Sequence, residues 1–207
     1  MERSFANQIV IATHSPYFLS WEGLKRGAVA CRLNMTETGS KLSLLSQASL
    51  DKILAIAHSD RKNVMLYDAV AKEIFFSKGV LFVEGSEDAN ILRSYVEENG
   101  LTYIEIFGYG SGGAPNIIHW LTMCDELGIR AFGLYDGDAE SSKRHAIARI
   151  KFADNSMIAV DQIWTPDIRD KPDDNKEGLF DEHWKIKGAH EDRLDELLRQ
   201  ISRHIGG

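Results

Sequence analysis

The chain has 207 residues, 43% of them hydrophobic and 27% charged, which is the composition of a globular protein and excludes a disordered or fibrous one. Its net charge of −7 argues against binding of a polyanion by the whole surface. It does not exclude a nuclease, because bound cations would offset part of the negative charge. No apolar run approaches the roughly 20 residues of a membrane span, and no secretion signal is recognisable, so we expect a cytoplasmic protein without a membrane partner.

The first third of the sequence combines a strand pattern, a short helix signal, a hairpin and a long helix. Gln8–Thr13 is an apolar, largely β-branched run, which predicts a buried strand ending before His14. Ser15 is suited to cap a helix that begins at Pro16. The other expected elements are strands over Ala28–Met35 and Leu42–Leu45 and a helix over Ser49–Phe76 with a break near Ser59.

From Lys78 onward the sequence alternates between apolar strands and amphipathic helices, which predicts right-handed crossovers and an α/β fold with a parallel sheet flanked by helices. The expected strands are Val80–Val83, Tyr103–Phe107, Arg130–Leu134 and Met157–Ile163. The expected helices are Glu87–Asn99, Pro115–Leu127, Glu140–Phe152 and His190–His204. Thr165–Gly178 is polar and predicts a loop, mobile over Asp170–Lys176. The predicted domains are residues 1–76 and 77–207.

Two short acidic motifs follow the first and third of these later strands. Glu84-Gly85-x-x-Asp88 is the first motif, and Asp136-Gly137-Asp138 is the second. Ligands of parallel sheets bind beyond the carboxyl ends of the strands, so we expect these side chains to meet there. Clustered carboxylates repel one another unless a cation neutralises them, which predicts a divalent metal and phosphoryl-transfer chemistry. Asp88 has an alternative role as an acid that stabilises a helix N-terminus.

The order, spacing and strand context of Glu84, Asp136 and Asp138 resemble the Toprim domain of topoisomerases, primases, recombination factors and OLD-family (overcoming lysogenization defect) nucleases. The resemblance extends from about residue 75 to residue 164. It implies a Rossmann-like fold in which these three acids bind metal. OLD-family nucleases also tend to carry Ser-x-Glu after the fourth strand as further metal-site residues. The nearest match here is Thr165 with Asp167, and Arg169-Asp170 is the alternative.

The N-terminal segment Ile9–Leu19 is similar to the last catalytic strand and switch-histidine loop of ABC-type ATPases. His14 then stands where that histidine reads the γ-phosphate of ATP, although an ordinary capping loop is the alternative. An ATPase ending followed by a Toprim domain resembles the OLD-family layout, which implies that residues 1–76 are an ATPase remnant. The chain has no Gly-x-x-x-x-Gly-Lys-Ser/Thr motif, and Gly108–Gly113 lacks the phosphate-binding lysine. We therefore expect no ATPase activity from this chain alone, and ATP would act only through a missing or separate ATPase core.

The resulting hypothesis is a DNA endonuclease that uses two Mg²⁺ or Mn²⁺ ions. Glu84, Asp136 and Asp138 would hold one ion. Asp88 and Asp167 would hold the other and share the substrate phosphate. By resemblance, the role would be defence against phage or other foreign DNA.

A cation beside the metals would stabilise the charge of the transition state, and Lys185 and Lys187 are the candidates. The expected partners are DNA, further copies of the chain and an ABC-type ATPase region or protein. One alternative keeps an enzyme but changes the reaction to that of a primase-like nucleotidyltransferase or an RNA nuclease. The other is a non-catalytic interaction module, which the replacement of the usual Ser and Glu by Thr165 and Asp167 favours.

Overall fold

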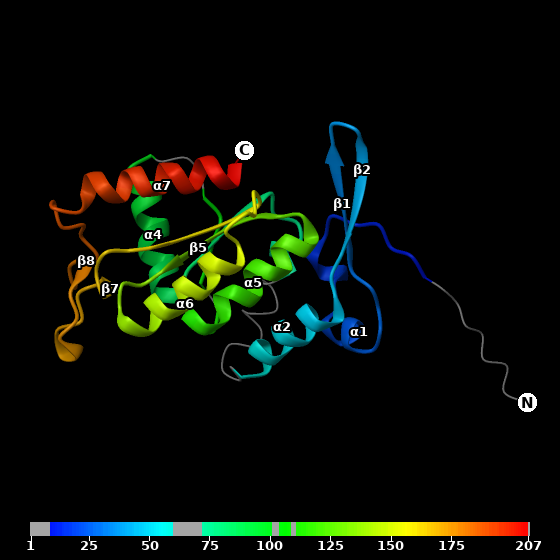
Figure 1. Cartoon of the computed structure of the whole chain (residues 1–207), viewed down its shortest axis with the longest axis horizontal. Coiled ribbons are helices and arrows are strands. Elements are labelled where there is room, and N and C mark those ends of the chain that lie inside the picture. The colour runs from blue at the N-terminus through cyan, green and yellow to red at the C-terminus, as the bar shows by residue number, and fades with distance from the viewer. Residues whose placement is uncertain (1–8, 60–71, 101–103, 109–110, 207) are drawn as a thin grey trace, which may run out of the picture.

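The computed structural model describes residues 9–59, 72–100, 104–108 and 111–206 (Figure 1). Its centre is a parallel sheet of four strands in the order β4-β3-β5-β6. The strands are β3 (Gly79–Phe82), β4 (Ile106–Phe107), β5 (Arg130–Tyr135) and β6 (Ile158–Gln162). Each lies within one to three residues of the strand expected from the sequence, so the predicted α/β fold with a parallel sheet is confirmed.

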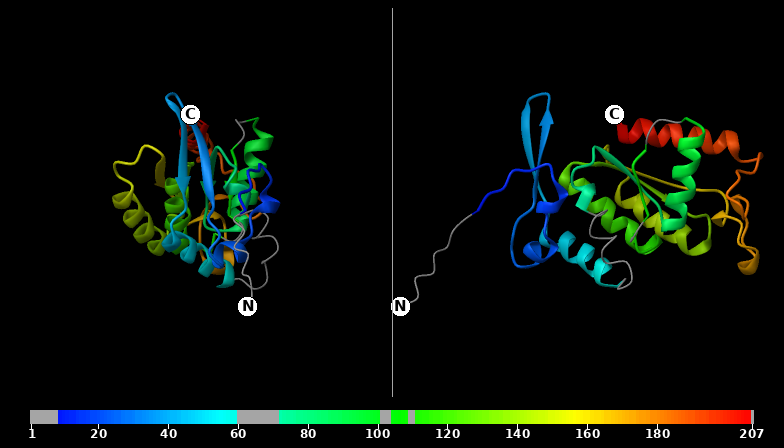
Figure 2. Two further views of the ribbon diagram at one scale, coloured as in Figure 1. Left: turned by 90° about the vertical axis from the view of Figure 1, so that its right-hand side faces the viewer. Right: turned by 180° about the vertical axis from the view of Figure 1, so that it is seen from behind.

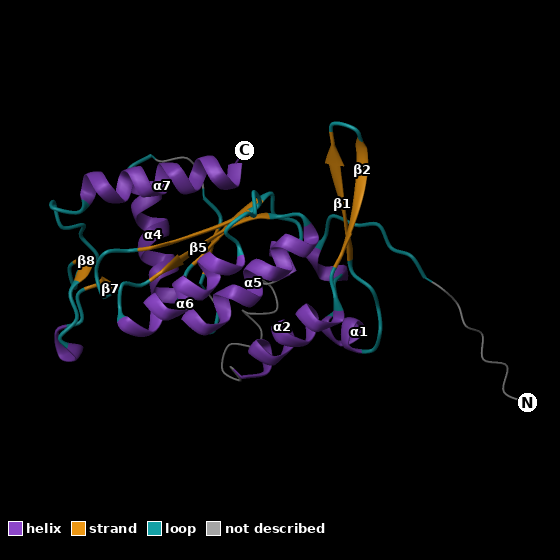
Figure 3. Cartoon of the chain, viewed as in Figure 1, coloured by secondary structure: helices purple, strands orange, loops and turns teal. Residues whose placement is uncertain are grey.

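Helices cover both faces of this sheet (Figure 3). On one face lie α5 (Ala114–Leu127) and α6 (Ala139–Lys151), which pack with Val80 and Phe82 of β3. On the other lie α4 (Ser86–Glu98) and α7 (Glu191–Gly206), which pack with Leu81. Successive side chains of a strand point to opposite faces, so a continuous apolar strand is what a sheet covered on both sides requires. None of the helices in the described part of the chain is long and apolar enough to cross a membrane.

The segment before the sheet contains a single 3-10 turn, a short helix, a hairpin and a longer helix. They are Pro16–Phe18, α1 (Trp21–Lys25), β1 (Cys31–Thr36), β2 (Gly39–Leu44) and α2 (Gln47–Ser59). The hairpin was expected, and α2 ends where a break was predicted. Residues 72–74 are again helical, while the middle of the expected helix lies outside the described residues.

Two expectations for the N-terminal end are wrong. The described part of the predicted first strand pairs with no other strand, and Ile9 and Val10 are 79% and 86% exposed. An apolar run forms a buried strand only where a neighbouring strand supplies its hydrogen bonds, and the described residues supply none here. The helix expected from Pro16 stops after one 3-10 turn, and Ser15 makes no side-chain capping hydrogen bond.

The N-terminal segment nevertheless packs on the sheet domain. Ile53 and Ile56 of α2 belong to the same buried cluster as Trp120 of α5. The hairpin is attached by hydrogen bonds, because Asn34 Nδ2 donates to the carbonyl oxygen of Leu127 at 2.9 Å. Figure 2 shows the hairpin standing at one end of the molecule, away from the C-terminal small sheet described next.

The polar stretch before α7 is more ordered than expected. It forms a two-stranded parallel sheet of β7 (Asp167–Arg169) and β8 (Gly178–Phe180), joined through a 3-10 turn at Pro172–Asp174. The supposedly mobile loop is closed by two backbone hydrogen bonds between Lys171 and Lys176. Backbone hydrogen bonds and lysine ion pairs, which no local sequence pattern reveals, hold this segment against the carboxyl ends of the main strands.

Candidate functional site

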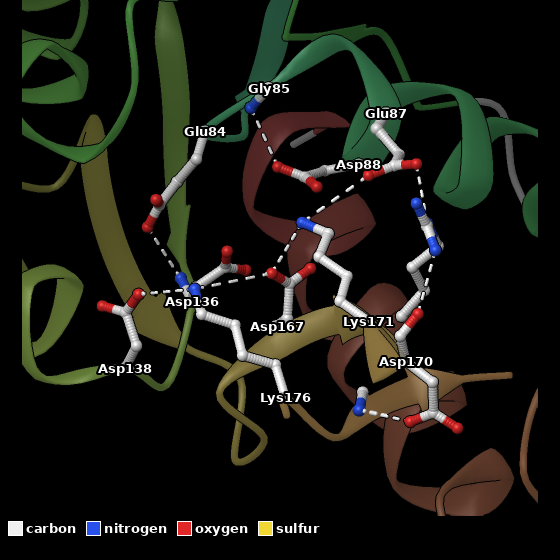
Figure 4. Close-up of polar contacts among 12 residues, drawn as sticks. Glu84, Gly85, Glu87, Asp88, Asp136, Asp138, Asp167, Asp170, Lys171 and Lys176 are labelled. Atoms are coloured by element: carbon white, nitrogen blue, oxygen red, sulfur yellow. Dashed lines mark hydrogen bonds and ion pairs between the residues drawn. The ribbon is translucent and has the colours of Figure 1, made fainter. Parts of the chain in front are cut away.

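Acidic side chains from three separate segments gather beyond the carboxyl ends of β3 and β5 (Figure 4). Glu84 follows β3 and Asp88 lies in the first turn of α4. Asp136 and Asp138 follow β5, and Asp167 begins β7. The structure thus brings together all five carboxylates that the sequence hypothesis assigned to metal.

Glu84 is fixed through its side chain and its backbone. Its Oε1 accepts a hydrogen bond from the backbone N–H of Asp136 at 2.9 Å, which ties the two strand ends together. Its carbonyl oxygen accepts one from the Ser111 hydroxyl at 2.5 Å and another from the backbone N–H of Gly113 at 3.2 Å. The glycine-rich loop Gly108–Gly113 therefore holds the backbone of one of the acids.

Gly137 explains why the second motif contains a glycine. A Cβ at this position would collide with the backbone carbonyl oxygen of Thr165, to which the Gly137 N–H donates a hydrogen bond of 2.8 Å. Only glycine permits this approach. The Thr165 hydroxyl donates in turn to the carbonyl oxygen of Asp167 at 2.8 Å. Thr165 thus shapes the turn that brings Asp167 to the cluster, and its hydroxyl is engaged in that turn.

Burial shifts the pKa values of the acids at the centre of the cluster. Desolvation raises the pKa of Asp136, and the nearby charges of Asp88 and Glu84 raise it further. Desolvation likewise raises the pKa of Asp88, although the N–H of Gly85 partly offsets the shift through a 2.8 Å hydrogen bond. The pKa of Glu84 is also raised, chiefly by burial. The ionised carboxylates therefore repel one another within a small volume, and a cation bound among them would reduce this repulsion.

Asp138 is held ionised by its own contacts. Its Oδ1 caps α6 by accepting the backbone N–H groups of Glu140 at 3.1 Å and Ser141 at 2.9 Å. Burial alone would raise the pKa of Asp138, but the hydrogen bonds from Ser141 and Lys176 outweigh burial and lower the pKa. Asp138 therefore combines helix capping with a place at the site.

Two lysines from the β7–β8 connection enter the cluster. Lys171 Nζ lies 2.7 Å from Asp167 Oδ2 and 3.6 Å from Glu87 Oε2. Lys176 Nζ lies 3.3 Å from Asp138 Oδ2 and 3.8 Å from Asp167 Oδ2. Desolvation lowers the pKa of Lys171, but contact with Asp167 outweighs it and the pKa is raised. Both ammonium groups are thus held charged beside the acids.

Arg169 adds a further cation on the outer side of the cluster. Its Nε lies 2.6 Å from Glu87 Oε1, and its Nη1 donates to the carbonyl oxygen of Asp170 at 2.9 Å. Glu87 is therefore shared between Arg169 and Lys171. The ion pair joins the first turn of α4 to β7, so the small sheet is fastened to the helix that carries Asp88.

The clustered carboxylates are chemically suited to bind a divalent cation. Among the described residues, no three acids, histidines or cysteines form a compact metal-binding group as they stand, and lysine ammonium groups are paired with Asp138 and Asp167. One oxygen, Asp167 Oδ1, is buried and has no hydrogen-bond partner in the described structure. A buried anionic oxygen without a partner is costly, and hard oxygen donors of this kind suit Mg²⁺ or Mn²⁺.

The structure places the other predicted residues away from the cluster. Lys187 Nζ contacts Asp170 Oδ1 at 2.5 Å. Lys185 is exposed, and its backbone N–H donates to Asp181 Oδ1 at 2.9 Å. His14 is exposed in the N-terminal segment, at the opposite end of the molecule from β7 and β8 (Figure 1).

Sequence reasoning missed Lys171, Lys176 and Ser111. The two lysines stand in a stretch rich in Asp and Lys, a composition that favours a solvated loop, so no local signal separated them from Lys185 and Lys187. Ser111 lies in a glycine-rich loop, where a lone serine between glycines was the available signal. Their roles depend on tertiary contacts.

Residues 75–138 match the family model for the TOPRIM domain of overcoming lysogenization defect protein-like proteins. No curated protein is similar enough to the chain to count as a match. The matched residues include Glu84, Asp88 and both aspartates of the second motif, whereas Asp167 and the two lysines follow it. Together with the parallel sheet flanked by helices, the match supports an OLD-like Toprim domain in this part of the chain.

Proposed function

We propose that this chain is a metal-dependent endonuclease that cleaves phosphodiester bonds in DNA. An OLD-like Toprim domain indicates nuclease or nucleotidyl-transfer chemistry, and the match over residues 75–138 supports that class. The observation that carries the proposal is the convergence of five carboxylates from separate segments, three of which, Glu84, Asp88 and Asp136, have raised pKa values. Defence against foreign DNA remains a proposal drawn from the resemblance.

The carboxylates divide into two groups. Glu84, Asp136 and Asp138 follow the two main strands and would hold one Mg²⁺ or Mn²⁺ ion. Asp88 and Asp167 would hold the second ion. Bound divalent ions supply an activated water and neutralise the leaving oxygen in phosphodiester hydrolysis. Metal binding and proton binding compete for the same oxygens, so the raised pKa values of Asp88 and Asp136 make metal binding by both groups dependent on pH.

The lysines of the β7–β8 connection fit the role of phosphate contacts. Lys171 and Lys176 are 28% and 36% exposed at their side chains, so their ammonium groups remain open to a ligand while paired with acids. Their placement favours them over Lys185 and Lys187 as the cations that offset charge on the substrate phosphate. This role extends the sequence hypothesis and rests on geometry alone.

The test is plasmid nicking with Mg²⁺ or Mn²⁺ by the full chain and by Glu84→Gln and Asp136→Asn. We expect wild type to nick supercoiled DNA and both variants to lose activity by a factor of at least about 10², as expected when a charged group that stabilises the transition state is removed. The matched control is Asp154→Asn, which changes an exposed carboxylate after α6 and should leave nicking unchanged.

Other outcomes distinguish the alternatives. Cleavage of RNA alone would support an RNA nuclease, and incorporation of labelled nucleotides on a primed template would support a nucleotidyltransferase. If a folded wild type binds Mn²⁺ but acts on no nucleic acid, the non-catalytic interaction module gains support. Equal activity in wild type and Asp136→Asn would contradict the assignment of the site.

We also propose that the N-terminal end packs against an ABC-type ATPase region. The face of the hairpin that bears Leu33 and Leu42 is exposed, at 65% and 57%, while the other face carries Asn34 and is tied to α5. Ile9 and Val10 are exposed at the same end. Such an apolar surface is typical of an interface. The chain alone should neither hydrolyse ATP nor respond to it in the nicking assay, and ATP hydrolysis by the purified chain would contradict this view.

A further inference from the structure

A turn that follows β8 carries an exposed tryptophan. The turn leaves β8 after Phe180 and returns to it through a bridge between Phe180 and Ile186. Asp181 organises its interior, because Oδ1 accepts the backbone N–H groups of His183 at 2.8 Å and Lys185 at 2.9 Å. The N–H of Trp184 donates to the carbonyl oxygen of Asp181 at 3.1 Å. These hydrogen bonds hold the backbone of the turn in which Trp184 lies.

Trp184 is energetically unfavourable at this position in two respects. Its φ of +64° lies in the left-handed region, where glycine and asparagine are usual and a bulky aromatic residue is an outlier. Its side chain is also 44% exposed although tryptophan is one of the largest apolar residues. Strained non-glycine residues concentrate at functional sites, where another requirement outweighs the strain. The exposed part of Trp184 is open to a ligand.

The turn belongs to the small sheet that contributes Asp167 to the carboxylate cluster. Strands β7 and β8 are parallel, with Asp167 opposite Gly178 and Arg169 opposite Phe180. Phe180 is therefore two residues, or roughly 7 Å, along the small sheet from the level of Asp167. The turn begins at the next residue, so a strand whose phosphate contacts the cluster can run along the small sheet toward Trp184.

The chemistry of the turn suits an unpaired base. Tryptophan offers a flat aromatic face, and Lys185 beside it is exposed and cationic. The Asp181 carboxylate is occupied by the N–H groups of the turn, and Glu182 lies 3.6 Å from the ring of His183. Stacking on an aromatic ring needs a base that is not covered by its neighbours in a duplex.

We propose that Trp184 stacks on an unpaired base of the strand held at the carboxylate cluster. The inference rests on the proposed nuclease function and deepens it. It makes single strands, or duplexes with an unpaired segment next to the cleavage site, the preferred substrates over intact duplex.

The experiment measures binding of short fluorescent oligonucleotides by the full chain, with Ca²⁺ replacing Mg²⁺ and gels confirming that the strands stay intact. We expect Trp184→Ala to weaken single-strand binding about five- to a hundredfold and to change duplex binding little. Trp184→Phe should retain most of the affinity because it keeps an aromatic ring. Tyr17→Ala, which removes a 91% exposed aromatic ring at the far end, is the matched control and should bind as wild type does.

Two further readouts separate stacking from a structural role. A 2-aminopurine base in the single strand should be quenched by wild type and less by Trp184→Ala. Trp184→Gly relieves the left-handed strain, so its melting temperature should equal or exceed that of wild type while its single-strand affinity falls. A lower melting temperature together with unchanged affinity would assign Trp184 to the fold and overturn the inference.

The outcomes also separate this inference from the proposed function. If wild type binds and cuts DNA but Trp184→Ala binds single strands and quenches 2-aminopurine as wild type does, only the stacking role fails. If wild type binds neither single strands nor duplex and cuts neither, the proposed function fails with it.

Discussion

Replacing Asp136 by asparagine should stabilise the metal-free protein while removing its activity. The pKa of Asp136 is raised to about 9 by desolvation and by the charges of Asp88 and Glu84, so burying this group is unfavourable once the unfolded chain is ionised. Asparagine has nearly the same shape and no charge. The folded-state pKa is above the unfolded value, so stability due to this residue is fully present below about pH 4 and is lost as the pH rises toward 9.

The size of the effect follows from that pKa shift. Each unit corresponds to about 1.4 kcal/mol, which sets an upper limit of about 6 kcal/mol at pH ~8. Because Asp136 retains some contact with water and titrates together with Asp88, we expect a gain of about 2–4 kcal/mol. In a protein of this length, that gain corresponds to a rise in melting temperature of roughly 5–15 °C.

The assay is thermal unfolding of wild type and Asp136→Asn in EDTA at about pH 5 and pH 8. The difference between them should be small at the lower pH and large at the higher one. Added Mg²⁺ should raise the melting temperature of wild type more than that of the variant, because the ion binds only the folded site. Asp154→Asn, an exposed carboxylate, is the control. A variant that is no more stable than wild type at pH 8 without metal would refute the reasoning.

Three other substitutions test separate parts of the site. Gly137→Ala places a Cβ against the carbonyl oxygen of Thr165, so we expect a loss of about 1–3 kcal/mol in unfolding free energy and at least about tenfold slower nicking, measured by urea titration and plasmid assay. Ser111→Ala removes the hydrogen bond to the Glu84 carbonyl, so we expect the free energy of unfolding to fall by about 1 kcal/mol. Calorimetry should also show weaker Mn²⁺ binding, and an unchanged Mn²⁺ affinity would show that the loop does not position this acid. Lys171→Met removes an ammonium group beside the acids, so Mn²⁺ should bind more tightly while nicking slows; weaker Mn²⁺ binding would contradict competition between lysine and metal.

Local patterns sufficed for the strands and helices of the sheet domain. Gly100 and Gly128, both with positive φ, end helices where the sequence placed those ends, and apolar runs between them could only be buried strands. The acids were predictable for the same reason, because a residue that follows a parallel strand must lie at the edge where ligands bind. The positions of the strands and the site edge thus followed from local periodicity.

Contacts between distant segments were beyond such reasoning. Lys176 reaches Asp138 because β7 and β8 pair across a polar connection whose composition resembles any solvated loop. Conversely, Ile9 and Val10 belong to an apolar run typical of a buried strand, but both are exposed. Burial requires a neighbouring segment, and the run itself does not indicate whether one is present. In both cases the outcome depends on which segments meet, and a periodicity in one segment carries no information about that.

The central claim is that a divalent ion binds among the five clustered carboxylates. The most direct test is a crystal of the full chain soaked in Mn²⁺ and measured for anomalous scattering. We predict a peak bounded by Glu84, Asp136 and Asp167, with Lys171 or Lys176 displaced from its carboxylate partner. A well-ordered site that keeps its lysine–carboxylate pairs and shows no peak at saturating Mn²⁺ would contradict it.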